Sequence, residues 1–198
     1  MYAVQRVEQA ISEEEYLATE RQQQDKHEWY QGESFAMAGG SRWHNLLSTR
    51  ILSALVPHLE GTPCTPYMAD LRLYIETHHH YVYPDILVVC DEIAYIAEDM
   101  VNDAAVIFEI LSPGTESYDR GRKFLHYQSL PSLREYVLIS QTIMQVEVYR
   151  RKQDGKWEYE RLTEPTAQLR LTALDYVMTL EHLYRDMPIK RSGGKWEA

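Results

Sequence analysis

Two carboxylates stand out because each is the only acid inside a strand-like run of apolar residues. Asp85 lies within YVYPDILVVC (81–90) and Glu109 within AAVIFEILS (104–112). An unpaired charge in such a setting costs several kcal/mol, so each acid needs a partner. If the two strands are neighbours, their carboxylate oxygens converge and suit a hard divalent cation, Mg²⁺ or Mn²⁺. Such an ion can activate water and stabilise charge on a phosphoryl group.

A purely structural explanation of the two acids stays open. Each could form a buried ion pair with an arginine such as Arg72, or burial could raise its pKa until the carboxyl is neutral. Lys123, in YDRGRKF, is a candidate for a third member that orients or deprotonates the water. Its spacing from Asp119 equally fits an exposed i, i+4 salt bridge on a helix. Arg120, Arg122 and Lys123 form the densest basic cluster near the acids, where a phosphate backbone would have to be met.

Three other positions have two interpretations each. His44 shares the apolar stripe of a predicted helix, so it is either a satisfied core histidine or a residue that supports the site. Asp70, at the start of a predicted strand, is either a third acid in the cleft or a turn residue. The run 78–80 is three histidines, but consecutive residues at a strand tip alternate faces and cannot all bind one ion, which favours an exposed turn.

The elements that must position these residues follow from periodicity and turn chemistry. We predict an outer helix over 12–24 with a Ser12–Glu15 capping box, a hairpin over 27–38, and a long helix between Ser41 and Gly61. Strands are predicted at 70–75, 81–90, 104–112 and 135–140, a helix at 116–129, a second hairpin at 145–162, and a covering segment at 169–187. Strand, helix, strand implies a right-handed crossover and a parallel pair at the centre of the sheet.

Composition is typical of one globular domain. The 198 residues are 44% hydrophobic and 25% charged, and we predict a single domain over 1–198 with its core at about 41–140 and a flexible tail at about 188–198. The formal charge of −10 argues against a broadly basic surface that coats nucleic acid. Without a long apolar run or a signal peptide, a cytoplasmic location is expected, and Cys64 and Cys90 are expected to be reduced core thiols.

Four ordered blocks of the chain resemble a known family: YQGESFAMAGGSRWHN, YVYPDILVVCD, VIFEILSPGTESYDRGRKFLHY and LPSLREYVLIS. They look like the bacterial Uma-two family of restriction-endonuclease-like proteins, a branch of the PD-(D/E)XK nuclease superfamily. The resemblance implies an α/β fold of restriction-endonuclease type. Its αβββαβ core surrounds a central mixed sheet, with an N-terminal helix and hairpin and a C-terminal hairpin extension. It also implies that the "PD" aspartate and the glutamate of the third strand bind the metal.

Pro84-Asp85 match the first of these elements and Glu109 the second. The chain departs from the superfamily pattern two residues later, where Leu111 stands in the place of a lysine. The resemblance implies that this lysine has moved to the following helix, where Lys123 matches it. The carbonyl of Ile110 is a further candidate metal ligand.

The expected function is therefore a metal-dependent endonuclease that acts on DNA. A non-catalytic module that binds nucleic acid or protein is the alternative, favoured by the missing lysine and the negative net charge. A hydrolase of smaller phosphodiesters is a third possibility. A homodimer is expected, because double-strand cutters of the superfamily commonly pair two sites and the second hairpin offers an edge strand.

Overall fold

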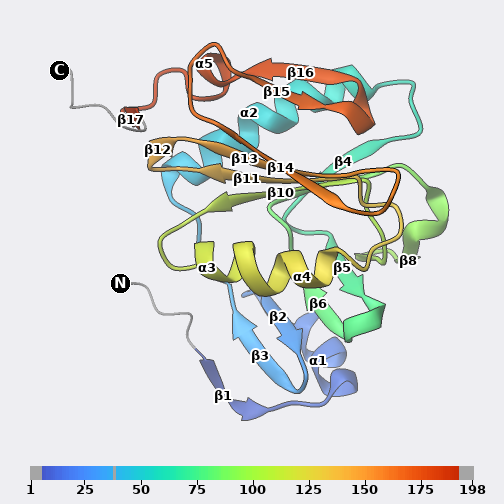
Figure 1. The fold of residues 1–198 in the computed structure, drawn as a ribbon. Helices are drawn as coiled ribbons and strands as arrows, with labels where there is room; N and C mark the ends of the chain where they lie inside the picture. Colours follow the sequence, from blue (N-terminus) through green and yellow to red (C-terminus); the bar gives the residue numbers. More distant parts are fainter. Residues whose placement is uncertain (1–5, 38, 192–198) are drawn as a thin grey trace.

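The computed structural model describes residues 6–37 and 39–191. They form two large mixed sheets (Figure 1). In spatial order the first sheet comprises β1 (Arg6–Ala10), β3 (Glu33–Ala36), β2 (His27–Tyr30), β6 (His80–Val82), β5 (Arg72–Ile75), β9 (Met100–Val101) and β8 (Tyr95–Ala97). The second comprises β14 (Trp157–Leu162), β13 (Val146–Arg151), β11 (Glu135–Ser140), β10 (Val106–Leu111), β7 (Ile86–Val89) and β4 (Thr65–Met68). The α/β class and the central mixed sheet are confirmed.

The described residues also form α-helices, short 3₁₀ segments and two short strand pairs. The helices are α1 (Glu13–Glu20), α2 (Arg42–Leu59), α3 (Glu116–Tyr118), α4 (Phe124–Tyr127) and α5 (Leu180–Leu183). The short pairs join β12 (Ile143–Met144) to β17 (Lys190–Arg191), and β15 (Gln168–Leu171) to β16 (Tyr176–Thr179). Within these residues no helix is long and apolar enough to cross a bilayer.

Local sequence signals account for the N-terminal elements. Ser12 caps α1 by accepting a hydrogen bond from the amide of Glu15, and Ser41 caps α2 in the same way. The β2–β3 turn has positive φ at both central residues, Gln31 (49°) and Gly32 (84°), as a tight hairpin turn requires. The predicted cap, hairpin and long helix are confirmed, while α1 ends at Glu20, four residues early.

The single strand predicted over 81–90 is wrong. β6 pairs in the first sheet and β7 in the second, and the chain passes between the sheets over residues 83–85. Pro84 offers no amide hydrogen to a ladder, which disfavours a central strand paired on both sides at this residue. Asp85 therefore lies at the junction of the two sheets, immediately before β7.

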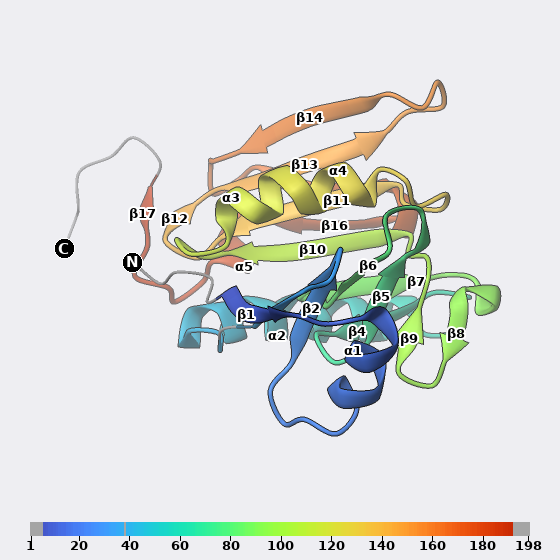
Figure 2. The same cartoon turned by 90° about the horizontal axis from the view of Figure 1, so that it is seen from below.

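The predicted parallel pair is confirmed, because β10 and β11 run parallel in register from Val106↔Glu135 to Leu111↔Ser140. The segment between them forms α3, a π-helical turn at Asp119–Lys123, and α4. Figure 1 places this helical segment between the two sheets, and Figure 2 shows it running alongside β10. The predicted C-terminal hairpin is β13–β14, and it extends the second sheet.

Strand alternation assigns the two faces of β10 to different cores. Val106, Phe108 and Ile110 belong to the core that contains α2, together with the covering residues of β15, β16 and α5. Ile107 and Leu111 belong to the core on the side of α4. Because side chains alternate along a strand, Glu109 faces α4 and the π-helical turn.

The expectation of two reduced thiols is wrong in this structure, where Cys64 and Cys90 form a disulfide. β4 and β7 are antiparallel with Thr65 opposite Val89, so the next pair outward is Cys64 and Cys90. Register, which the separate sequence segments do not reveal, brings the two sulfurs together.

The C-terminal predictions have mixed outcomes. The segment 169–187 contributes Leu169, Leu174 and Leu183 to the α2 core, as a covering segment should. Of the predicted tail, Lys190 and Arg191 pair with β12, and 192–198 lie outside the described residues.

Candidate active site

Asp85 and Glu109 converge where the ladder between β7 and β10 ends. The last ladder pair is Ile86 with Phe108. Beyond it, the Asp85 amide donates to Glu109 Oε2 (3.3 Å) and the Ile110 amide donates to Asp85 Oδ2 (2.7 Å). The two carboxylates thus continue the ladder through side-chain bonds. Asp85 keeps 13% of its side chain exposed and Glu109 only 4%, so the pair forms a nearly buried acid site with one edge open to solvent.

Lys123 supplies the positive charge of the site. Its ammonium lies 2.8 Å from Glu28 Oε1, 3.1 Å from Glu109 Oε1 and 3.6 Å from Asp119 Oδ1. The predicted i, i+4 pair with Asp119 therefore exists, but it is buried rather than exposed. The Tyr127 hydroxyl donates a second hydrogen bond to Glu109 Oε1 (2.9 Å).

His44 reaches the site from the first turn of α2. Its Nε2 lies 2.9 Å from Asp85 Oδ1, and the ring is half-buried. Burial alone lowers the pKa of His44, but the hydrogen bond and charge of Asp85 outweigh it, so the pKa lies above its ordinary value. Gly40 leaves room for the ring, since a Cβ on Gly40 would lie 2.7 Å from His44 Nδ1.

We expect Gly40→Ala to turn His44 away from Asp85, because the added methyl group and the ring cannot occupy the same space. The pKa of His44 should then fall toward its ordinary value. NMR titration of the imidazole C–H signals measures this shift. Gly39→Ala is the matched control, because a Cβ there meets nothing within 4 Å. A pKa that stays raised in Gly40→Ala would show that Gly40 does not set the position of the ring.

The site carries more negative than positive charge. Burial is the largest cause that raises the pKa of Glu109 well above its ordinary value, and Lys123 opposes it. Neighbouring carboxylates, Asp119 first, raise it further. Burial likewise raises the pKa of Asp119 to about 6, against the opposing charge of Lys123. Four carboxylates share one ammonium and one imidazole, so the site favours an additional cation.

The donor set fits Mg²⁺ or Mn²⁺. In the part of the chain that the structure describes, no group of three or more His, Cys, Asp or Glu side chains is arranged to hold a metal ion. Lys123 fills the space between Glu28, Glu109 and Asp119. Asp85 and the side of Glu109 that faces it therefore remain as the pair of candidate metal ligands. Two carboxylates with several waters is a normal protein site for Mg²⁺, whereas Zn²⁺ takes three or four N, S or O ligands.

The remaining sequence candidates lie elsewhere. Asp70 is 86% exposed and forms an ion pair with Lys26, in a turn after β4. Arg72 is buried but pairs with Asp99 (2.5 Å), so it does not neutralise either acid of the site. Of the run 78–80, His79 is exposed as expected, but His80 is fully buried in β6, a strand that is buried on both faces.

The basic cluster of the helix is largely used within the protein. Arg120 pairs with Glu116 and Glu147, both at 2.6 Å, and Lys123 is buried. Arg122 is exposed, with its guanidinium over the Tyr30 ring. Only one of the three predicted phosphate-facing cations is therefore free of a described ion pair and open to solvent.

Sequence reasoning missed Glu28 as a site residue and gave Asp119 only a structural role. Glu28 lies in β2 of the first sheet, far from Glu109 in the sequence, and nothing local marks it except that it is an acid within the short strand HEWY. Asp119 could have been predicted as a buried site residue, because it is four residues from Lys123 and so lies on the same side of that helix.

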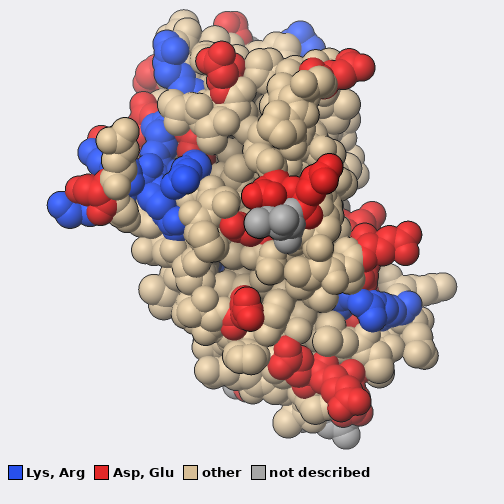
Figure 3. All heavy atoms as spheres, turned by 90° about the vertical axis from the view of Figure 1, so that its right-hand side faces the viewer, with Lys and Arg blue, Asp and Glu red and all other residues tan. Residues whose placement is uncertain are grey.

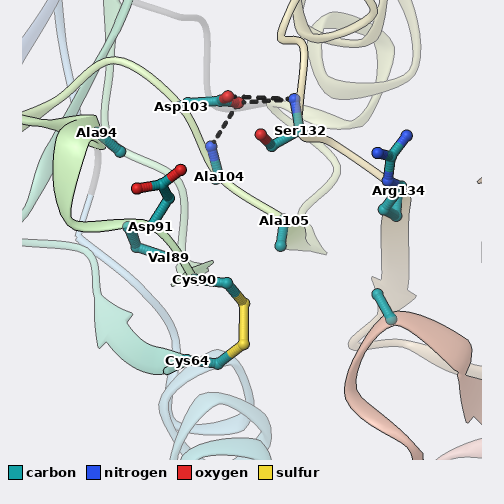
Figure 4. Close-up of a pocket in the computed structure, with 11 residues that line it drawn as sticks. Cys64, Val89, Cys90, Asp91, Ala94, Asp103, Ala104, Ala105, Ser132 and Arg134 are labelled. Carbon is teal, nitrogen blue, oxygen red and sulfur yellow. Dashed lines mark hydrogen bonds between the residues drawn. A yellow bond between two sulfur atoms is a disulfide. The ribbon is translucent and has the colours of Figure 1, made fainter. Parts of the chain in front are cut away.

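A separate pocket of about 410 Å³ lies at the other ends of β7 and β10 (Figure 4). Its lining includes the disulfide, Asp103 and Arg134, and excludes Asp85 and Glu109. The Asp103 carboxylate accepts hydrogen bonds from the amides of Ala104 and Ser132, so it stabilises a turn. The acid pair, rather than this pocket, remains the candidate active site.

Comparison with known proteins agrees with this fold. The model of a family named Uma2 and described as "Putative restriction endonuclease" matches residues 13–181. The uncharacterized protein slr1290 of Synechocystis sp. is 33% identical over 177 residues, which cover 89% of this chain and 93% of that protein. The uncharacterized protein sll1609 of the same organism is 32% identical over 157 residues, covering 78% and 89%. A crystal structure described as a "putative nuclease belonging to DUF820" from Anabaena variabilis superposes with a TM-score of 0.66 at 19% identity, covering 80% and 89% of the two chains.

Proposed function

Because the chain belongs to the Uma2 family of restriction-endonuclease-like nucleases, we propose that it is a metal-dependent endonuclease that hydrolyses phosphodiester bonds in DNA. The observation that carries the proposal is the convergence of Asp85 and Glu109 at one edge of the sheet with the ammonium of Lys123 beside them. Two acids and a lysine are the minimum set that the chemistry of this superfamily uses.

In this proposal Asp85 and Glu109 hold Mg²⁺ or Mn²⁺, and the carbonyl of Ile110 is a further ligand. When bound, such an ion lowers the pKa of its water and stabilises charge on the phosphoryl group. His44 orients Asp85 through the 2.9 Å contact to Oδ1. The Ile110 amide holds the other oxygen of the same carboxylate, so the side chain is fixed from two sides.

Lys123 acts as a fixed cation in this scheme. Burial opposes its charge, but Glu109, Glu28 and Asp119 together keep its pKa well above the ordinary value. A lysine that stays protonated cannot take a proton from water. It can orient the water and face the negative charge that develops on the phosphate.

A local basic surface supports DNA as the substrate despite the net charge of −10. Arg134 and Arg151 meet at the ends of β11 and β13, where the Arg151 amide donates to the Arg134 carbonyl. Arg150 faces the other side of β13, where it pairs with Glu135 and Glu160. Figure 3 shows a cluster of Lys and Arg side chains at the left of the view, while the centre of that face carries mainly Asp and Glu. A local basic patch is what contact with a phosphate backbone requires.

A homodimer remains part of the proposal, and β14 supports it. This strand stands at the end of the second sheet, and Tyr159 on it is half-exposed. An unpaired edge strand can add a strand from a second copy.

The wild-type protein tests the proposed function directly. We expect nicking of supercoiled plasmid in Mg²⁺ or Mn²⁺, loss of nicking in EDTA, and recovery when the ion is added back. A matched RNA and a small phosphodiester, bis-(p-nitrophenyl) phosphate, test the substrate class. DNA binding without metal-dependent turnover would instead favour the non-catalytic module. Cleavage of the small ester alone would favour the third hypothesis.

A further inference from the structure

Glu28 is the member of the acid cluster that comes from the other sheet. It lies in β2, is 5% exposed, and its Oε1 is the closest carboxylate oxygen to the Lys123 ammonium, at 2.8 Å against 3.1 Å for Glu109. The amide of Tyr83 also donates to this oxygen, at 3.2 Å. Glu28 therefore competes with Glu109 for the same ammonium across the junction of the two sheets.

A chain of hydrogen-bonding groups ends at Glu28. The Tyr118 hydroxyl is hydrogen bonded to Glu28 and lies 3.0 Å from His80 Nε2. His80 Nδ1 in turn lies 2.8 Å from His126 Nδ1. Both imidazoles are buried, and Tyr30 packs its ring against each of them.

All hydrogen bonds of this chain are donated in the same direction, toward Glu28. Burial, with the positive charges of His126 and Lys123 next, lowers the pKa of His80 to about 2, so His80 is neutral and carries one N–H. The Tyr118 hydroxyl donates a hydrogen bond to the Glu28 carboxylate, so its oxygen accepts a hydrogen bond from His80 Nε2–H. His80 Nδ1 then accepts from His126 Nδ1–H. Each donor points toward Glu28, so this chain of hydrogen bonds orients the Glu28 carboxylate.

The position of the Lys123 ammonium determines how much of the Glu109 carboxylate is available to a metal ion. Among the described residues, Oε1 of Glu109 accepts from both Lys123 and Tyr127, while Oε2 accepts the long bond from the Asp85 amide alone. Without the charge of Glu28, the ammonium would have only Glu109 and Asp119 as partners. It would then neutralise the carboxylate that a divalent cation needs.

We propose that Glu28 is a positioning residue that holds the Lys123 ammonium, and so keeps Glu109 available to a divalent cation. The hydrogen bonds from Tyr118 and, behind it, His80 hold the Glu28 carboxylate in place for this task. The inference rests on the proposed function, in that Asp85 and Glu109 are taken as the ligands of that cation. Glu28 itself is not a ligand in this account, and that distinction can be measured.

The test is Mg²⁺ and Mn²⁺ titration calorimetry on four proteins: wild type, Glu28→Gln, Lys123→Met and the double variant. We expect Glu28→Gln to weaken binding about tenfold, and the double variant to bind as tightly as Lys123→Met, because no ammonium remains to compete. Tyr118→Phe, a milder change, should weaken binding about threefold. Glu147→Gln is the matched control, since Glu147 is also 5% exposed and paired with a cation, Arg120, yet should leave binding unchanged.

Two results would overturn the proposal. If the double variant binds the metal ions as weakly as Glu28→Gln, then Glu28 is itself a ligand. If Glu28→Gln binds them as tightly as wild type, then Glu28 does not position the Lys123 ammonium. A wild type that neither binds the ions nor nicks DNA refutes the proposed function instead. In that case NMR of the metal-free protein tests the positioning role. The ¹⁵N chemical shift of the Lys123 ammonium must then change in both Glu28→Gln and Tyr118→Phe.

Discussion

Replacing Asp85 with asparagine is expected to lower metal-dependent cleavage of DNA by at least about a thousand-fold, which corresponds to about 4 kcal/mol in the barrier. The change removes one of the two negative charges that would hold the ion. It keeps the shape of the side chain, and the amide oxygen of asparagine can still accept the hydrogen bond from the Ile110 amide. The fold should therefore survive, and calorimetry should show loss of Mg²⁺ binding in parallel with loss of plasmid nicking.

Asp70→Asn is the control for this experiment, because it makes the same chemical change on an exposed side chain outside the cluster. Its nicking rate and Mg²⁺ affinity should equal those of wild type. Undiminished nicking by Asp85→Asn would remove Asp85 from the metal site. A loss of activity in Asp70→Asn would restore the hypothesis that Asp70 is a third acid of the cleft.

Replacing Lys123 with methionine should have opposite effects on stability and on metal affinity. Removal of the ammonium leaves Glu28, Glu109 and Asp119 buried without their shared partner, which should destabilise the metal-free protein by about 3–5 kcal/mol. The same variant should bind Mg²⁺ more tightly than wild type, because the ion no longer competes with a cation. Its cleavage should nevertheless fall about a hundred-fold, since no fixed charge faces the phosphate.

Urea unfolding with and without Mg²⁺ measures both parts of this prediction, since saturating ion should restore more stability to Lys123→Met than to wild type. Lys152→Met is the control. Lys152 also forms an ion pair, with Glu158 at 3.1 Å, but half of its side chain is exposed, and such pairs contribute less than about 1 kcal/mol. Unchanged stability of Lys123→Met would mean that its ammonium does not neutralise the buried acids.

The sequence was sufficient to predict much of the fold and the identity of the acid pair. A lone acid in an apolar strand must be compensated, and this rule selected Asp85 and Glu109 before any geometry was known. Strand period also fixes that Glu109 faces the same side as Ile107 and Leu111. Caps and turn residues located the ends of α2 and the β2–β3 turn, because those signals act within a few residues.

Periodicity says which face a side chain takes but not what meets it there. Glu28 contacts Lys123 only because β2 and the helical segment pack together across two sheets, and no local pattern encodes that packing. His80 was expected in an exposed turn, because three consecutive histidines at a strand tip cannot all bind one ion. Its buried position depends on Tyr118 and His126, which lie about forty residues away in the chain. The disulfide between Cys64 and Cys90 was not predicted for the same reason, because it depends on the register of β4 and β7 and not on a local pattern.

The π-helical turn at Asp119–Lys123 bears on how related chains should be aligned. A π-helix closes hydrogen bonds between residues five apart, so it accommodates one residue more than an α-helical turn. Here Lys123 reaches Glu109 across a separation of 14 residues. A relative with a regular α-helix in this segment would need its lysine one position nearer to the acid. A search for the displaced lysine should therefore allow a gap of one residue, and should not take a mismatch at a fixed spacing as loss of the residue.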